Sequence, residues 1–248
     1  MRVAAIYDIH GNLPALEAVL EEVRFAQAEI IVVGGDVVPG PMPRETLERL
    51  LDLDLPVQFI KGNGEVGVLA EMTGAGAVRY PEQVREIMRW SAQQIFPEYE
   101  QFVAGWAKTL RIEIGGLGAV LFCHATPRDD NEIFTRLTPE ERLLPIFEKL
   151  DVSLVVCGHT HMQFDRMIGK IRVVNAGSVG MPYGESGADW LLLDEDVQLQ
   201  HTTYDLAKAA GRIRKTNYPQ AQEFAEYHVL QPPKEEQMLE VFTRRELK

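Results

Sequence analysis

The first sixty residues alternate apolar runs with amphipathic segments. Three runs have the length and composition of buried strands: Val3 to Tyr7, Glu29 to Val33 and Val57 to Ile60. Between them, apolar side chains recur at helical spacing over residues 13–23 and again over 46–51. Asn12 can cap the first of these helices, and Pro14 suits its first turn. Strands that alternate with helices through short connections predict a parallel sheet with right-handed crossovers.

Helical and strand-like patterns also divide the rest of the chain. Residues 65–108 have a helical pattern, in which Pro81 and Pro97 open separate segments. Strand-like runs follow at 111–114, 119–123, 154–157, 171–174, 190–193 and 198–203. From residue 205 the pattern is helical and charged, broken at Pro219 and again at 232–233. We therefore expect a single domain over residues 1–248, with a helical insertion at about 65–108 and a helical C-terminal extension at about 205–248.

Polar side chains that can bind metal follow the predicted strands, at the point where each strand ends. The candidates are Asp8, His10, Asp36, Asn63, His124, His159 and His161. Ligands of open α/β sheets bind outside the carboxyl ends of the strands, so these side chains are expected to meet at one edge. Two pairs, 8/10 and 159/161, are spaced so that an extended backbone would point both members the same way. Imidazole, carboxylate and amide groups without thiolates suit Mn, Fe, Zn, Ni or Co, and the set is too rich in nitrogen for a dedicated Mg or Ca site.

The candidate ligands stand in five short motifs. In chain order these are Asp8-Ile9-His10, Gly35-Asp36, Gly62-Asn63, His124 and Gly158-His159-Thr160-His161. Motifs of these types in this order resemble the calcineurin-like metallophosphoesterase superfamily. Residues 13–20, 124–128 and 175–180 are further similar to its small bacterial and archaeal phosphodiesterase-like branch, and the resemblance extends from residue 1 to about 195. It implies an α/β fold, a four-layer α-β-β-α sandwich in which two mixed β-sheets face each other.

The resemblance also implies a centre with two divalent metal ions. The ligands would divide into one set of Asp8, His10 and His161, a second set of Asn63, His124 and His159, and Asp36 as the bridge. The residues that would act in catalysis through the metals are Asp8, Asp36, Asn63 and His124. A water shared by both ions would have its pKa lowered toward roughly 7, which supplies a bridging hydroxide for hydrolysis of a phosphodiester or nucleotide phosphoanhydride. Asn63 and Arg128 are candidate contacts to the substrate phosphate, with a solvated loop as the alternative for Arg128.

The third motif departs from the superfamily pattern. Many relatives carry a histidine after the asparagine, where it is thought to protonate the leaving group, whereas this chain has Gly64. General acid catalysis contributes about 10²–10⁴-fold, so we expect a preference for good leaving groups such as aryl esters or phosphoanhydrides. Glu65 is the alternative proton donor. The residues after Asp36 are Val37-Val38-Pro39-Gly40 and not the Asp-Arg-Gly of Ser/Thr protein phosphatases, which argues against protein phosphatase activity.

The formal net charge of -12 and the isoelectric point near 5.0 limit the partners. Because no cluster of Lys and Arg is visible, we do not expect nucleic acids or anionic membranes to bind. The expected partner is a small phosphorylated substrate. A nuclease and a non-catalytic binding module on the same fold are the alternatives, and a homo-oligomer is left open. The apolar runs are too short to span a bilayer, no signal peptide is visible, and the two cysteines are expected to be reduced, so a cytoplasmic location is expected.

Several residues of reactive type are expected to have structural roles. His201 and His228 lie outside the motifs and are expected in the core or in hydrogen-bonded loops. Cys123 and Cys157 stand in apolar strands and are expected to be small buried hydrophobic side chains. The large aromatic side chains of residues 90–106 are expected to pack in an amphipathic core and not to line a base-stacking pocket.

Overall fold

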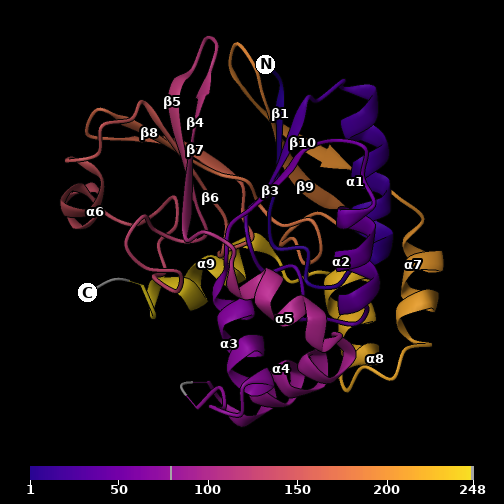
Figure 1. The fold of residues 1–248 in the computed structure, drawn as a ribbon. Coiled ribbons are helices and arrows are strands. Elements are labelled where there is room, and N and C mark those ends of the chain that lie inside the picture. Colours follow the sequence, from indigo (N-terminus) through magenta and orange to yellow (C-terminus); the bar gives the residue numbers. More distant parts are fainter. Residues whose placement is uncertain (79, 247–248) are drawn as a thin grey trace.

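Two five-stranded β-sheets face each other, and each carries helices on its outer side (Figure 1). The computed structural model describes residues 1–78 and 80–246. The strands of the first sheet are β1 (Val3–Ile6), β2 (Ile30–Val33), β3 (Val57–Phe59), β9 (Ala188–Leu193) and β10 (Val197–Thr202). They lie in the order β10-β9-β1-β2-β3. β2 pairs in parallel with β1 and β3, as predicted, whereas β9 pairs antiparallel with β1 and β10.

The second sheet is mixed as well. Its strands are β4 (Thr109–Ile114), β5 (Gly118–Cys123), β6 (Leu154–Cys157), β7 (Phe164–Ile168) and β8 (Ile171–Asn175), in the order β4-β5-β6-β8-β7. The three central strands are parallel, and β4 and β7 pair antiparallel at the edges. β7 was not predicted, because Asp165 and Arg166 interrupt its apolar pattern. The predicted α-β-β-α sandwich is confirmed.

The apolar core lies in three layers, which explains why the early strands are apolar on both faces. Between the sheets, Val3 of β1 belongs to the same buried cluster as Phe122 of β5. On the outer face of the first sheet, Ile6 packs in a second cluster with α1 (Leu13–Phe25). A third cluster joins the second sheet to α6 (Glu140–Phe147). The central strands of each sheet are therefore covered by apolar side chains on both faces.

The helices begin where local chemistry favours them. The side-chain oxygen of Asn12 accepts a hydrogen bond from the N–H of Ala15 (3.3 Å), and Pro14 stands in the first turn of α1, as predicted. α2 (Pro43–Leu51) also begins with a proline. The sequence pattern did not predict α6, because Pro145 lies inside it.

The helices of the insertion lie at the end of the sandwich where α8 and α9 also lie (Figure 1). They are α3 (Asn63–Met72), α4 (Glu82–Gln94) and α5 (Pro97–Ala104). The extension contains α7 (Leu206–Ile213), α8 (Ala221–Phe224), a π-helical segment (Ala225–Leu230) and α9 (Glu235–Thr243). Insertion and extension meet where the rings of Trp90 and Tyr218 lie edge to face, 5.3 Å apart. The division into one domain with these two additions stays a prediction.

The aromatic side chains of the insertion are only partly core residues. Trp106 is buried and stacks on Phe59 with ring centroids 4.7 Å apart, as predicted. Phe96 and Phe102, in contrast, are 42% and 38% exposed. Within the described residues, no helix combines the length and the apolar character needed to cross a bilayer.

Candidate metal centre

The loops that follow β1, β2 and β6 interlock at one edge of the sandwich. The backbone N–H of Asp8 donates to the carbonyl of Gly35 (3.1 Å), and that of His10 donates to the carbonyl of Asp36 (2.8 Å). The N–H of His159 donates to Oδ2 of Asp8 (2.8 Å). These bonds bring together side chains that are up to 151 residues apart in the sequence.

Five predicted ligands have a left-handed backbone. The φ angles are 53° at Asp8, 48° at His10, 53° at Asp36, 66° at His159 and 56° at His161. Among the other non-glycine residues that the structure describes, only Gln27 has a positive φ. The condition of an extended backbone within each pair is therefore not fulfilled, and the side chains converge through left-handed residues instead. Such conformations cost on the order of 1–3 kcal/mol each and cluster at functional sites, where the surrounding structure holds them.

Asp8, His10 and His161 form a group that we call cluster 1. Oδ1 of Asp8 lies 3.3 Å from Nε2 of His161 and 3.8 Å from Nε2 of His10. The two Nε2 atoms are 3.2 Å apart. Nδ1 of His10 faces the carbonyl of Pro39 (3.2 Å), and Nδ1 of His161 faces the carbonyl of Met181 (2.9 Å). When each Nδ1 donates to its carbonyl, two Nε2 lone pairs and a carboxylate oxygen converge, as in a metal site.

Asp8, Asp36 and His124 form a second group, cluster 2. Nε2 of His124 lies 3.6 Å from Oδ1 of Asp36 and 3.9 Å from Oδ1 of Asp8. The amide oxygen of Asn63 is 3.0 Å from the same nitrogen. Nδ1 of His124 lies 2.9 Å from the carbonyl of Gly34, which directs Nε2 toward the carboxylates.

Asp8 and Asp36 lie between the two clusters. Oδ1 of Asp8 belongs to both; it is buried and has no hydrogen-bond partner among the described residues. Asp36 directs Oδ1 toward His124 and places Oδ2 3.7 Å from Nε2 of His10. His159 is more distant, with its ring centroid 5.2 Å from that of His124. A buried anionic oxygen without a partner is costly, and a divalent cation would satisfy it, so the donor set fits the metal that the motifs imply.

Burial and mutual charge shift the pKa values of these side chains. Burial lowers the pKa of His10 to about 3, and the charge of His161 adds to the effect. Burial and the charge of His124 likewise lower the pKa of His159 to about 3. Burial raises the pKa of Asp36 to about 7, against the opposing effect of His124. His10 and His159 are therefore neutral at pH 7, the form of imidazole that binds metal.

Glu65 holds the ligand loops together. Its buried carboxylate accepts hydrogen bonds from the backbone N–H groups of Asp36 (2.7 Å), Val37 (2.7 Å), Val38 (3.2 Å) and Gly62 (2.9 Å). Both carboxylate oxygens are engaged by the backbone. Glu65 is thus a structural acceptor in this structure, and these hydrogen bonds argue against the alternative in which it donates a proton to the leaving group.

Gly64 lies directly against the carboxylate of Asp36. Its N–H donates to Oδ1 of Asp36 (2.7 Å). A Cβ atom at this position would lie 2.7 Å from that oxygen and 2.5 Å from Cγ of Pro39, closer than real Cβ contacts. A side chain at this position would therefore require the carboxylate of Asp36 or the ring of Pro39 to shift, which the glycine avoids.

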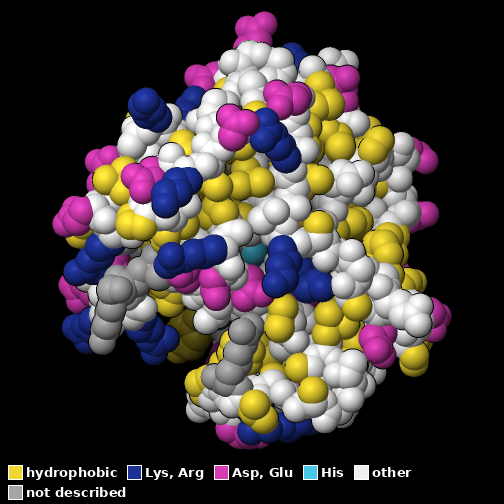
Figure 2. Space-filling view, turned by 60° about the vertical axis from the view of Figure 1, so that its left-hand side comes forward, with side chains coloured by type: hydrophobic (Ala, Val, Ile, Leu, Met, Phe, Trp, Pro, Cys, Tyr) yellow, Lys and Arg dark blue, Asp and Glu magenta, His cyan; other side chains and the backbone are white. Residues whose placement is uncertain are grey.

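Arg128 lies beside the centre but has a partner of its own. Its Nε is 2.8 Å from a carboxylate oxygen of Glu132. It lines a cleft next to His124 together with Lys61 and Lys108. Figure 2 shows Lys and Arg side chains on both sides of a recessed histidine. The contact of Arg128 with a substrate phosphate stays a prediction.

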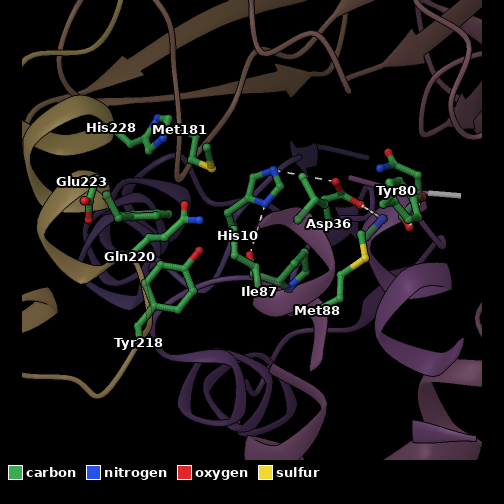
Figure 3. Close-up of a pocket in the computed structure, with 15 residues that line it drawn as sticks. His10, Asp36, Tyr80, Ile87, Met88, Met181, Tyr218, Gln220, Glu223 and His228 are labelled. Atoms are coloured by element: carbon green, nitrogen blue, oxygen red, sulfur yellow. Dashed lines mark hydrogen bonds and ion pairs between the residues drawn. The ribbon is translucent and has the colours of Figure 1, made fainter. Parts of the chain in front are cut away.

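A cavity opens on the His10 side of the centre, and most of its wall was not predicted (Figure 3). His10, Asp36 and Asn63 lie at one side of it. The other walls include Met88, Met181, Tyr218, Gln220 and His228. His228 packs its ring against Phe224, with ring centroids 5.2 Å apart, and also lines the cavity, so its expected structural role stays a prediction. A lone histidine in a helical tail belongs to no local motif, so only the fold brings it to the site.

The other residues expected to be structural are where the sequence predicts them. Cys123 and Cys157 are buried free thiols. Nδ1 of His201 lies 2.7 Å from a carboxylate oxygen of Asp189. These predictions are confirmed.

Known proteins are similar to this chain in sequence and in fold. Residues 1–198 match the calcineurin-like phosphoesterase superfamily domain. An uncharacterized protein from Methanocaldococcus jannaschii is 30% identical over 239 residues, covering 88% of this chain and 94% of that protein. Phosphodiesterase YfcE from Escherichia coli is 29% identical, covering 79% of this chain and 89% of that protein.

Two solved structures have the same fold at lower sequence identity. A hypothetical protein from Pyrococcus horikoshii superposes with a TM-score of 0.80 at 20% identity, covering 94% of this chain and 99% of that one. A metallophosphoesterase from Sphaerobacter thermophilus superposes with a TM-score of 0.69 at 24% identity, covering 91% and 96%. The chain therefore belongs to the calcineurin-like phosphoesterase superfamily and is a metal-dependent phosphoester hydrolase.

Proposed function

We propose that this hydrolase acts on a phosphodiester or a nucleotide phosphoanhydride with two divalent metal ions bound in clusters 1 and 2. The position of Asp8 and Asp36 between the clusters is the observation that supports two ions best. Oδ1 of Asp8 lies within 3.9 Å of histidine nitrogens on both sides, and Asp36 directs one oxygen to each cluster. A similar protein, YfcE of Escherichia coli, is named a phosphodiesterase, which supports the class of substrate.

The proposed ligand sets are Asp8, His10 and His161 for one ion and Asn63, His124 and His159 for the other, with Asp36 shared. The proposed catalytic residues, acting through the metals, are Asp8, Asp36, Asn63 and His124. Bound divalent cations would supply Lewis acidity and lower the pKa of a bound water toward roughly 7. Mixed nitrogen and oxygen donors suit Mn, Fe, Zn, Ni or Co, and we propose manganese as the first ion to test.

The chain itself contributes positioning. The carbonyls of Pro39, Gly34 and Met181 accept from the Nδ1 side of three imidazoles and so hold each Nε2 toward the centre. Hydrogen bonds of this kind fix the tautomer and the ring orientation of metal-binding histidines. The hydroxyl of Tyr80 donates to the carbonyl of Asn63 (3.1 Å) and supports the loop that carries this amide.

The leaving group receives no proton from position 64. Because Gly64 has no side chain and Glu65 is engaged by the backbone, the chain offers neither as a general acid. We therefore propose that the preferred substrates have leaving groups that depart as stable anions. Without a general acid, the hydrolysis of alkyl esters would be slower by about 10²–10⁴-fold, whereas aryl esters, whose leaving groups are stable anions, would be little affected.

A leaving-group series tests this function. Methyl phosphodiesters of p-nitrophenol, phenol and ethanol would be assayed with Mn²⁺. We expect rates to fall steeply as the leaving group becomes more basic. Equal rates for aryl and alkyl esters would overturn the leaving-group proposal. No turnover of these esters or of a nucleotide phosphoanhydride with any of the five metals would overturn the proposed function.

The number of ions is tested separately. Metal analysis after loading and gel filtration is expected to give two ions per chain, and Asp36→Asn is expected to lower this number. Glu240→Gln, on an exposed residue of α9, is the matched control and is expected to keep both ions. One ion per chain in the wild type would contradict the dinuclear proposal.

A further inference from the structure

The cavity on the His10 side of the centre is built mainly by parts of the chain other than the two sheets. α4 of the insertion supplies one wall through Val84, Ile87 and Met88. The extension supplies the opposite wall through its residues 218–228. The superfamily match ends at residue 198, before the extension begins, so this wall belongs to a part of the chain outside the matched domain.

The cavity is continuous with the metal centre. Its lining includes His10, Asp36, Asn63 and Gly64. Figure 3 shows His10 and Asp36 between the extension residues on one side and Tyr80 on the other, with Ile87 and Met88 below them. A group that is esterified to a phosphate at the centre can therefore enter the cavity without leaving the site.

The size of the cavity limits what enters. Its volume is about 190 Å³. This is the space of roughly six water molecules, and it lies below the ~300–1,000 Å³ of pockets that enclose drug-sized ligands. A cavity of this size has room for a single ring system.

The charge of the cavity favours a neutral group. Glu223 and Asp36 are its acidic members, and of the described residues that line it none is Lys or Arg. A second phosphate placed beside Glu223 would meet no Lys or Arg side chain among the described lining residues. The apolar side chains of Ile87, Met88 and Met181 instead suit the faces of an uncharged ring.

The extension residues that line the cavity carry three polar groups besides the carboxylate of Glu223. They are the hydroxyl of Tyr218, the amide of Gln220 and the imidazole of His228 (Figure 3). Nδ1 of His228 is buried and has no hydrogen-bond partner among the described residues. Burial lowers the pKa of His228 to about 4, so at pH 7 its ring is neutral and offers one donor and one acceptor.

A hydrocarbon ring would offer none of these groups a hydrogen bond, and Nδ1 of His228 would stay unsatisfied. An unsatisfied buried polar atom costs about 1–3 kcal/mol. A heteroaromatic ring with donors and acceptors on its edge satisfies them while its faces contact the apolar side chains. This combination of apolar faces and a hydrogen-bonding edge is the chemistry of a nucleobase.

We propose that this cavity binds the nucleobase of the substrate, with Gln220 and His228 hydrogen-bonded to the edge of the base. The substrate would then be a nucleoside phosphoester or phosphoanhydride; this part rests on the proposed function. Base binding itself does not, because the polar groups that hold the base belong to the extension.

Direct binding tests the cavity without the metals. The metal-free protein would be titrated by calorimetry with adenosine, guanosine, cytidine and uridine. We expect at least one nucleoside to bind with Kd on the order of 1 mM or tighter. His228→Leu and Gln220→Leu are each expected to weaken binding about tenfold, and Gln231→Leu, the same change at an exposed position outside the cavity, is expected to leave it unchanged. Absence of binding by all four nucleosides, or equal binding by wild type and both cavity variants, would overturn the proposal.

A pair of esters tests whether base binding contributes to turnover. The p-nitrophenyl ester of a nucleoside 5′-phosphate and methyl p-nitrophenyl phosphate have the same leaving group and differ only in the retained arm. The Mn²⁺-loaded enzyme is expected to show a KM about tenfold lower for the nucleoside ester, and both cavity variants are expected to reduce this difference. Turnover of both esters with equal KM values would overturn the cavity proposal and uphold the proposed function. Nucleoside binding without turnover of either ester would uphold the cavity proposal and overturn the proposed function.

Discussion

Replacing Gly64 by alanine tests how closely the chain fits around Asp36. The added Cβ would stand 2.7 Å from Oδ1 of Asp36, 3.0 Å from its Cγ and 2.5 Å from Cγ of Pro39. Ordinary contacts of a Cβ atom lie at 3.4–4 Å, so the carboxylate or the proline has to move by several tenths of an ångström. The hydrogen bond from the N–H of Gly64 to Asp36 (2.7 Å) would be disturbed by the same movement.

Two costs follow from this displacement. Overpacking a close contact costs about 1–3 kcal/mol of stability. Disturbing a group that orients a metal ligand typically costs about 10–100-fold in metal affinity or activity. We therefore expect Gly64→Ala to unfold at lower urea concentration and to bind Mn²⁺ about 10–100-fold more weakly than the wild type.

The measurements are urea denaturation in a chelator and calorimetric titration with Mn²⁺. Gly211→Ala is the matched control, because a Cβ at Gly211 meets nothing within 4 Å. This control is expected to keep its metal affinity. Gly64→His introduces the imidazole that many relatives carry, and we expect it to lose activity on aryl and alkyl esters alike. Wild-type metal affinity in Gly64→Ala, or a gain on alkyl esters in Gly64→His, would refute the packing argument.

Three further outcomes follow from the centre. In the metal-free protein burial raises the pKa of Asp36 from 3.8 to about 7, so the native state binds this proton more tightly than the unfolded state. The resulting stabilisation is complete below the unfolded-state pKa and is lost as the pH rises toward 7, which urea denaturation between pH 4 and 7 should show. If the unfolding free energy of Asp36→Asn depends on pH in the same way, the effect belongs to another group. Glu65→Gln replaces an acceptor of four backbone N–H groups by an amide with one oxygen, so we expect its free energy of unfolding to fall by about 2–4 kcal/mol in urea denaturation. Glu240→Gln is expected to unfold like the wild type. An unchanged denaturation midpoint in Glu65→Gln would contradict this role. Chelation is expected to abolish turnover and to lower the Tm, and added Mn²⁺ is expected to restore both, because a ligand that binds only the native state stabilises it. A Tm that does not change when Mn²⁺ is added would contradict metal binding by the native state.

The sheet and the placement of the polar side chains could be predicted from the sequence. β1, β2 and β3 are short apolar runs separated by amphipathic helices, and that order permits few arrangements other than a parallel sheet. The carboxyl ends of such strands meet at one edge, so the proximity of Asp8 and Asp36 followed. The motifs then supplied the family.

The backbone of the site could not be predicted. Spacing by two residues suggested an extended chain at Asp8 and His10, whereas both have a left-handed φ that other loops hold in place through long-range hydrogen bonds. The role of Gly64 was also hidden. The sequence shows only that histidine is absent at this position, whereas the structure shows that a Cβ atom there would displace Asp36 or Pro39.

The wall of the cavity was hidden for a different reason. His228 and Gln220 lie in a helical tail without a motif, and neither has a sequence neighbour that marks it as functional. They reach the centre because the extension packs on α4 through Tyr218 and Trp90. Contacts of this kind depend on tertiary packing between segments more than 100 residues apart.

Anomalous diffraction from crystals of the manganese-loaded protein tests the central claim most directly. We predict two peaks about 3.5–4 Å apart, one among Asp8, His10 and His161 and one beside Asn63, His124 and His159, with Asp36 between them. A single peak, or ions bound away from Asp8 and Asp36, would contradict the proposal that this centre holds two metals.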